Sequence, residues 1–119
     1  MCRFVAYSGL PLLLADLLYV PSDSLIRQSY HARERREPLN GDGFGVGWYV
    51  PEIDSTPCIV RSITPAWSSS NLRHLSFKTR APSLFAHVRA ASPGMAVTES
   101  NAHPFNYGRF MWMHNGMVA

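Results

Sequence analysis

Lysine is almost absent from this chain of 119 residues: ten of its eleven basic residues are arginine, and the single lysine is Lys78. The formal net charge is only +3. The one cluster of basic residues, 33–37, is interrupted by Glu34 and Glu37. A nucleic-acid surface needs more aligned positive charge than this. We therefore expect residues 33–37 to form a solvated loop, and we expect no nucleic-acid partner.

Cysteine is also scarce. The chain has two, Cys2 and Cys58, which cannot build a disulfide framework, and no Cys-x-x-Cys pair suggests zinc. His74, His87, His103 and His114 lack His-Glu-x-x-His or i,i+4 spacing, and Glu99 is the one carboxylate near this group in sequence. We therefore expect no metal site and no cofactor.

Long apolar runs and targeting signals are missing as well. The apolar stretch 10–20 contains Pro11 and Asp16 and is too short to span a bilayer. The first residues show no signal peptide. We expect no membrane partner and a cytoplasmic protein, in which the thiol of Cys2 stays reduced.

The remaining sequence alternates between strand and helix patterns. Hydrophobic content is 46%, enough for a real core in one domain. The composition predicts an α+β fold with antiparallel neighbours. Strands are expected at 2–8, 43–50, 58–63, 83–89 and 109–114, helices at 12–19, 24–30 and 69–79, and loops at 31–41 and 90–104.

One predicted strand has an unusual pattern. In residues 43–50, glycines 43, 45 and 47 alternate with large apolar residues. Glycine at every second position leaves one strand face bare, so a ligand or another backbone can approach it closely.

Cys2 is the first candidate for chemistry. A small residue after Met1 favours removal of Met1, which would give Cys2 both a thiol and a free α-amine. The amine has an ordinary pKa of about 7.7–8.0, so in a large minority of molecules at neutral pH it is unprotonated and can accept the thiol proton. The alternative is a buried cysteine that starts a core strand.

Three further segments carry suitable groups. The side-chain amide of Asn115 and the N–H of Gly116 can point at one oxygen as an oxyanion hole, although Asn-Gly is also a common hairpin turn. Arg89 ends a predicted strand and can bind a carboxylate through two N–H groups. Taken alone, it fits a surface arginine that pairs with a neighbouring acid better. His103 is held extended by Pro104 and can order a loop over a pocket, or simply anchor that loop.

Taken in order, five segments resemble the class II glutamine amidotransferases, a family of N-terminal nucleophile hydrolases. These segments are Met1–Phe4, Asn40–Tyr49, Ala86–Ala90, Asn101–Phe105 and Met113–Gly116. The run 40–45 and the segment 63–67 resemble the stand-alone branch that cleaves γ-glutamyl compounds, including the glutathione-degrading and ergothioneine-pathway types.

This resemblance implies roles for six residues and a fold. Cys2 is the nucleophile with its own α-amine as base, and Asn115 and Gly116 form the oxyanion hole. Arg89 holds the α-carboxylate of the substrate, Ser92 supplies a hydroxyl that contacts it, and His103 lines the pocket. The implied fold is the αββα sandwich of N-terminal nucleophile hydrolases, of which residues 1–119 would be one amidotransferase domain incomplete at its C-terminus.

The chain also departs from the family pattern. Ala90 and Pro93 stand where the family has a Trp or similar residue and often a His, and the family's acidic residue for the substrate ammonium lies beyond the His-Asn-Gly segment. For an N-terminal half alone we expect Phe110, Trp112, Phe85 and Trp48 to face water on one side, and we expect association or partial folding with little activity.

Two functions remain open at this point. The first is hydrolysis of a γ-glutamyl amide, either glutamine or a thiol peptide such as glutathione, with a second protein subunit as one destination for the ammonia. The second is a non-catalytic family member that acts as a binding or regulatory partner. The residues leave the particular γ-glutamyl compound open.

Overall fold

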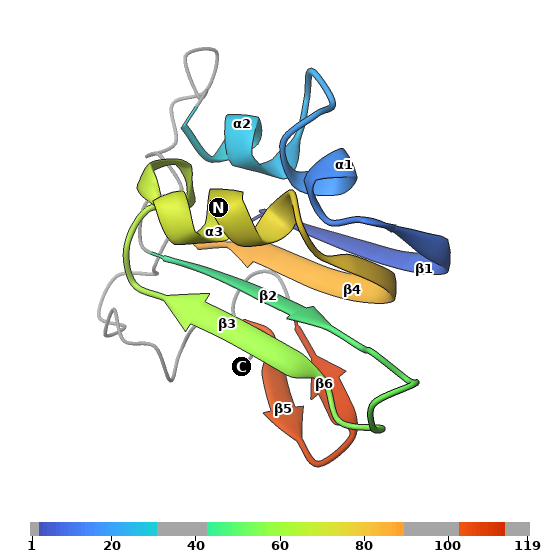
Figure 1. The fold of residues 1–119 in the computed structure, drawn as a ribbon. Coiled ribbons are helices and arrows are strands. Elements are labelled where there is room, and N and C mark those ends of the chain that lie inside the picture. The colour runs from blue at the N-terminus through green and yellow to red at the C-terminus, as the bar shows by residue number, and fades with distance from the viewer. Residues whose placement is uncertain (1–2, 31–42, 90–102, 114–119) are drawn as a thin grey trace.

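The computed structural model describes residues 3–30, 43–89 and 103–113, with only the backbone at 29 and 30. Its strands and helices form three layers: helices, a four-stranded sheet, and a small hairpin below the sheet (Figure 1). The strands are β1 (Arg3–Leu13), β2 (Phe44–Trp48), β3 (Cys58–Ser62), β4 (Arg80–Val88), β5 (Phe105–Tyr107) and β6 (Phe110–Trp112). The helices are α1 (Ala15–Leu18), α2 (Leu25–Tyr30), the 3₁₀ turn η1 (Ala66–Ser68) and α3 (Ser70–Ser76).

The large sheet has the strand order β1-β4-β2-β3, and every neighbouring pair is antiparallel. Arg3 pairs with Val88, Val88 with Phe44, and Phe44 with Ser62. These four residues form one row across the sheet. The first residue of β1 therefore lies in the same row as the last residue of β4.

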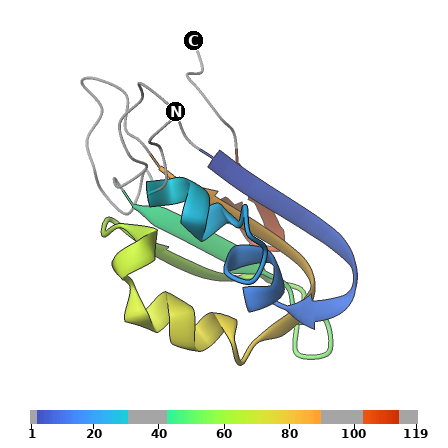
Figure 2. The same ribbon diagram turned by 90° about the horizontal axis from the view of Figure 1, so that it is seen from above.

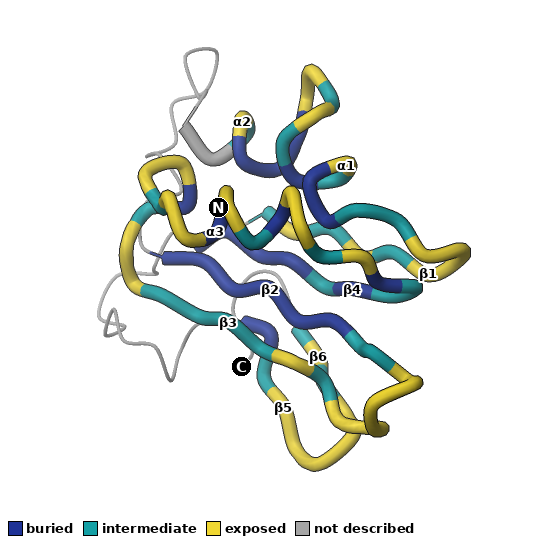
Figure 3. Tube along the Cα trace, viewed as in Figure 1, coloured by how far each residue is buried: buried dark blue, intermediate teal, exposed yellow. Residues whose placement is uncertain are grey.

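Side-chain alternation divides the sheet into two faces. Val46, Leu84 and Ala86 are buried in the core cluster beneath the helices, and Val5 packs against it from the edge strand. On β1 the intervening residues, such as Phe4, are exposed. Burial is deepest along the two central strands, β2 and β4 (Figure 3).

The helices cover one face of this sheet, as the view from above shows (Figure 2). Ser24 caps α2 by accepting a hydrogen bond from the Arg27 N–H at 3.3 Å. Ser69 caps α3 in the same way, accepting from the Leu72 N–H at 3.2 Å. Both caps satisfy N–H groups that lack a partner within the helix, which explains why these short helices begin where they do.

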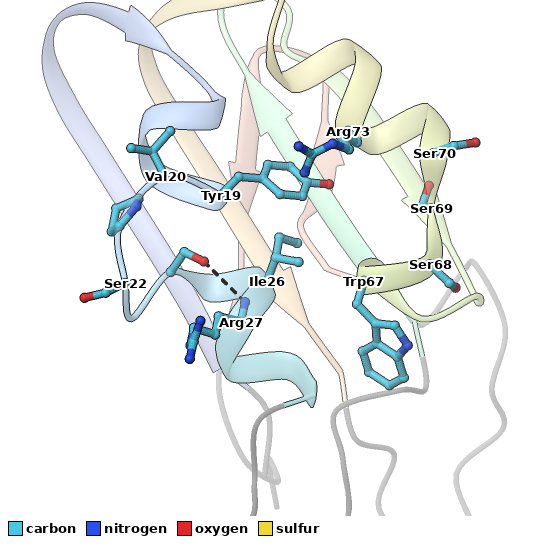
Figure 4. A pocket seen from close by; sticks show the side chains of 12 residues that line it. Tyr19, Val20, Ser22, Ile26, Arg27, Trp67, Ser68, Ser69, Ser70 and Arg73 are labelled. Atoms are coloured by element: carbon cyan, nitrogen blue, oxygen red, sulfur yellow. Dashed lines mark hydrogen bonds between the residues drawn. The ribbon is translucent and has the colours of Figure 1, made fainter.

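A groove of about 620 Å³ separates α2 from η1 and α3 in this helical layer. Tyr19 and Ile26 enter it from one side and Trp67 from the other (Figure 4). The guanidinium carbon of Arg73 lies 5.3 Å from the centre of the Tyr19 ring and 5.1 Å from that of Phe77. Burial raises the pKa of Tyr19 to about 12, and the charge of Arg73 acts in the opposite direction.

The opposite face of the sheet carries the hairpin of β5 and β6, which turns at Gly108 with a φ of 56°. A Cβ added to Gly45 would collide with the carbonyl oxygen of His103. A Cβ added to Gly47 would lie 2.6 Å from the sulfur of Met111 and 2.9 Å from Cγ of Pro104. The bare face predicted for residues 43–50 is therefore confirmed, and the group that approaches it is the backbone at His103.

Several expected elements are confirmed, and the expectation for the first helix is wrong. β2, β3, α2 and α3 fall within or close to the predicted ranges. The predicted helix 12–19 is wrong, because β1 continues to Leu13 and only Ala15–Leu18 is helical. Gly9 and Pro11 do not end the strand. They fall within an irregularity between Ser8 and Leu12, which an edge strand tolerates because one side of its backbone needs no sheet partner.

The C-terminal part of the described chain also differs from expectation. Strand β5 lies between the predicted loop 90–104 and the predicted strand 109–114, in residues to which no element was assigned, and its pairing with β6 forms the hairpin. Phe110 and Trp112 are exposed as expected, at 59% and 48%, and Phe85 is partly exposed. Trp48 is the error: it is 5% exposed, because its side chain lies on the helix face of β2 and joins the core.

The predicted loop 31–41 lies outside the described residues, as does most of the predicted loop 90–104. In the described part of the chain, no helix has both the length and the apolar composition that crossing a membrane requires.

Replacing Gly45 with alanine tests the contact between the sheet and the hairpin. We expect Gly45→Ala to lower the free energy of unfolding by about 3 kcal/mol, because the backbone of His103 must move away. Gly47→Ala is the comparison and should cost less, about 1–2 kcal/mol, because its Cβ meets side-chain atoms of Met111 and Pro104 and not a backbone carbonyl. Urea denaturation followed by circular dichroism measures both, and equal costs would show that the backbone contact is not tight.

The buried phenol of Tyr19 predicts a dependence of stability on alkaline pH. Because the folded state keeps this proton more tightly than the unfolded state, the contribution is complete below pH 10 and is lost as the pH rises towards 12. Tyr19→Phe should therefore lose less stability than the wild type between these two values. Identical pH profiles for the two proteins would contradict the assigned burial of the phenol.

Candidate functional site

The candidate site lies at the end of the sheet where β1 begins and β4 ends. Arg3 and Phe44 both pair with Val88, so the start of β1, the end of β4 and the start of β2 meet there. Residue 2 directly precedes this row in the sequence, and Arg89 directly follows it. Antiparallel pairing therefore brings together two chain positions that are far apart in sequence.

Arg89 is anchored at this end by its own backbone. Its N–H donates a hydrogen bond of 2.9 Å to the carbonyl oxygen of Gly43, which extends the pairing of β4 with β2 by one residue. The residue is only 3% exposed, so the alternative of an ordinary surface arginine is wrong. A buried guanidinium is uncommon and strongly favours an anionic counterpart, and its planar donors match a carboxylate.

His103 lies one row further into the sheet, above the bare face of Gly45, and is 7% exposed. Its ring stacks on the ring of His87, with centroids 4.3 Å apart and an angle of 28° between the planes. The ring of Phe105 also contacts His103, with the two ring centroids 4.5 Å apart. The ring of Trp112 lies next to Phe105, with a centroid separation of 6.2 Å. We call these four residues, His87, His103, Phe105 and Trp112, the ring column.

The ring column joins β4 of the large sheet to both strands of the hairpin. His87 is 1% exposed and pairs across the sheet with Gly45. Its side chain therefore shares the face that His103 covers. Sequence reasoning gave His87 no role. The sequence signal that could have identified it is its position two residues before Arg89 in a predicted strand, because residues 87 and 89 of a strand share a face.

Four of the six predicted site residues lie outside the described residues: Cys2, Ser92, Asn115 and Gly116. Their neighbours in the chain are described. The chain enters β1 at Arg3 and leaves β4 through Arg89. It leaves β6 through Met113, next to Trp112, which pairs with Phe105.

Other features of the described chain lie apart from this end. Cys58 is an exposed free cysteine that pairs with Trp48, at the opposite end of β2 from Phe44. The groove lined by Tyr19 and Trp67 belongs to the helical layer, on the other face of the sheet from His103. Within the described residues, no group of three His, Cys, Asp or Glu side chains could hold a metal ion.

Comparison with known proteins identifies the family. The sequence pattern described as glutamine amidotransferases class-II matches residues 12–119. The probable glutamine amidotransferase DUG3 of Saccharomyces cerevisiae is 44% identical over 126 residues, which cover 100% of this chain and 35% of the yeast protein. The γ-glutamyl-hercynylcysteine sulfoxide hydrolase of Mycolicibacterium smegmatis is 36% identical over 119 residues, covering 99% of this chain and 52% of that enzyme.

A solved structure agrees with these relatives. The glutamine aminotransferase class-II domain protein from Silicibacter pomeroyi superposes with a TM-score of 0.64 at 30% identity, covering 97% of this chain and 37% of that one. The chain thus spans about a third to a half of the length of the proteins it matches. The expected α+β fold of this family is confirmed, and the chain belongs to the class-II glutamine amidotransferases.

Proposed function

We propose that this chain carries the nucleophile half of a site that hydrolyses γ-glutamyl amide bonds. Cys2, exposed by removal of Met1, attacks the amide, and Arg89 holds the α-carboxylate of the γ-glutamyl group. The observation that carries the proposal is the row of Arg3, Val88 and Phe44, which brings the start of β1 next to the buried Arg89.

The reaction follows from the groups assigned to it. The neutral α-amine of Cys2 accepts the thiol proton, and the thiolate adds to the γ-carbonyl carbon of the substrate. The amide N–H of Gly116 and the side chain of Asn115 donate hydrogen bonds to the oxyanion. The intermediate then expels the leaving group of the substrate as ammonia or an amine, which takes its proton from the α-ammonium of Cys2, and a thioester remains. The α-amine of Cys2 next accepts a proton from water, and the resulting hydroxide cleaves the thioester. Glutamate is released, and the Cys2 thiolate regains its proton from the α-ammonium.

Buried charge supports the choice of a γ-glutamyl substrate. A γ-glutamyl group presents a free α-carboxylate at a fixed distance from the bond that is cut, and a guanidinium binds such a group with two parallel hydrogen bonds. Ser92 and His103 complete the contacts in this proposal. The name of the mycobacterial relative specifies a γ-glutamyl compound, which agrees with this substrate class.

Glutamine and γ-glutamyl thiol peptides both meet this description, since they share the part that Arg89 recognises. With glutamine the leaving group is ammonia, and a second subunit that accepts ammonia is part of the proposal for that case. We place the reaction in the cytoplasm, because a thiol nucleophile must remain reduced.

A second candidate function is binding of another polypeptide without catalysis. The observation in its favour is that Phe110 and Trp112 on β6 are about half exposed, and aromatic residues are enriched at protein interfaces. The two functions differ in their dependence on Cys2, because only catalysis needs the thiol.

The thiol of Cys2 can be tested by covalent labelling with a glutamine-analogue electrophile such as diazo-oxo-norleucine. We expect the adduct on Cys2 in protein that has lost Met1, and none after Cys2→Ala. Cys58 is a built-in control, because it is an exposed thiol at the other end of the sheet. Labelling of Cys58 in preference to Cys2 would remove Cys2 from the mechanism.

Substitution of Arg89 tests recognition of the carboxylate. We expect Arg89→Ala to raise KM for a γ-glutamyl substrate by the equivalent of about 2–4 kcal/mol, the range for loss of one partner of a buried charge pair. Arg89→Lys should restore only part of this, because an ammonium cannot form the two-pronged contact. Steady-state kinetics decide the point, and a KM within about twofold of the wild type would place Arg89 outside the site.

A further inference from the structure

His87 has no part in the chemistry proposed above, yet it is one of the most buried polar residues in the described chain. It lies on β4, two residues before Arg89, and pairs across the sheet with Phe4 on one side and Gly45 on the other. Its ring faces the hairpin, where it contacts His103. It therefore stands between the end of the sheet that carries Arg89 and the separate two-stranded layer below.

The contact between His87 and His103 is one of several that join the hairpin to the sheet. Others are the packing of Pro104 and Met111 over Gly47 and the hydrogen bond of 2.7 Å that the Tyr49 hydroxyl donates to the carbonyl oxygen of Arg109. Gly45 lets the backbone of His103 come against β2, but a bare glycine provides no side chain that would fix its sideways position. The ring of His87, in the neighbouring strand, supplies that surface with a ring separation of 4.3 Å. Together they define both the depth and the lateral position of His103.

The ring column carries this position on to β6. His103 contacts Phe105, the first residue of β5, and Phe105 contacts Trp112, the last residue of β6. Phe105 and Trp112 are also register partners in the hairpin. In the sequence, Asn115 and Gly116 follow Trp112 by three and four residues. The placement of His103 therefore contributes to the position of Trp112, the residue from which the chain continues towards these two.

We propose that His87 is a positioning residue, which acts through His103 and the ring column to hold the β5–β6 hairpin against the end of the sheet that carries Arg89. This inference rests on the proposed function for its effect on turnover. An oxyanion hole acts mainly in the transition state, so a displaced hairpin lowers kcat more than it raises KM. Misplacement of about 1 Å can cost about 10²-fold in rate.

Three substitutions separate stacking from other roles of the imidazole. His87→Phe keeps a flat ring but has no ring nitrogen, His87→Gln keeps polar atoms but has no ring, and His87→Ala has neither. His74→Ala is the matched control, because His74 is exposed on α3 in the helical layer. If ring stacking holds the hairpin, His87→Phe should keep the wild-type placement of the hairpin, whereas His87→Gln and His87→Ala should lose it.

The first measurement is hydrogen exchange at the amides of β5 and β6, which requires no catalytic activity. We expect exchange to become at least about tenfold faster in His87→Ala and His87→Gln, and to stay near the wild-type rate in His87→Phe and His74→Ala. Amides of β2 and β3 are the internal reference. Unchanged exchange in the hairpin of His87→Ala, or an equal increase throughout the sheet, overturns the inference.

The second measurement is steady-state turnover of a γ-glutamyl substrate. We expect kcat to fall by about 10²-fold in His87→Ala with KM within about threefold of the wild type, and His87→Phe to recover most of the loss. Loss in His87→Phe equal to that in His87→Ala would overturn a role for stacking. If Cys2 fails to label while the exchange pattern holds, the proposed function fails and the positioning of the hairpin stands.

Discussion

The close approach of the His103 backbone to Gly45 is the contact on which the arrangement of this molecule depends. No side chain larger than hydrogen fits at this position, because a Cβ would meet the carbonyl oxygen of His103. This contact lets a second layer of strands lie on the face of the sheet opposite the helices. It also places His103 beside His87, so that one glycine makes room for the whole ring column.

Antiparallel register then brings the candidate site residues to one end of the sheet. Because β1 runs against β4, β1 begins where β4 ends, and the buried Arg89 lies one residue beyond their shared row. A positive charge that is 3% exposed is expensive unless an anion or dipole compensates it. The fold thus holds a buried guanidinium next to the strand that follows Cys2, and we propose that this group binds the carboxylate of a γ-glutamyl substrate.

Local patterns in the sequence were sufficient for the elements with strong signals. The alternating glycines predicted β2 and its bare face. The N-cap residue types within 21–24 and at the start of 69–79 predicted α2 and α3, and the structure identifies Ser24 and Ser69 as the caps. The predicted helix 12–19 was wrong at its start. The leucines of this stretch suit a buried helix, but pairing with β4 keeps Leu12 and Leu13 in the strand. Strand β5 has only three residues and gains its strand geometry from pairing with β6, so local composition gave no sign of it.

The candidate site could likewise be predicted only in part from the sequence. Arg89 and His103 could be proposed from motifs, but their burial depends on contacts between segments distant in sequence. His87 illustrates the difference: its role depends on the register that sets it opposite Gly45 and on the packing that sets it under His103. Neither is visible from the residue's immediate neighbours in the chain.

The covalent intermediate provides the most direct test of the central claim, that the chain begins with a catalytic thiol next to a carboxylate-binding arginine. The protein would be mixed with a γ-glutamyl substrate, quenched in acid within the first turnovers, and analysed by mass spectrometry of its N-terminal peptide. We expect a peptide that starts at Cys2 and carries one glutamyl group as a thioester, and much less of this adduct in Arg89→Ala at a substrate concentration near the KM of the wild type. A peptide that retains Met1, or a glutamyl group found on Cys58, would contradict this claim.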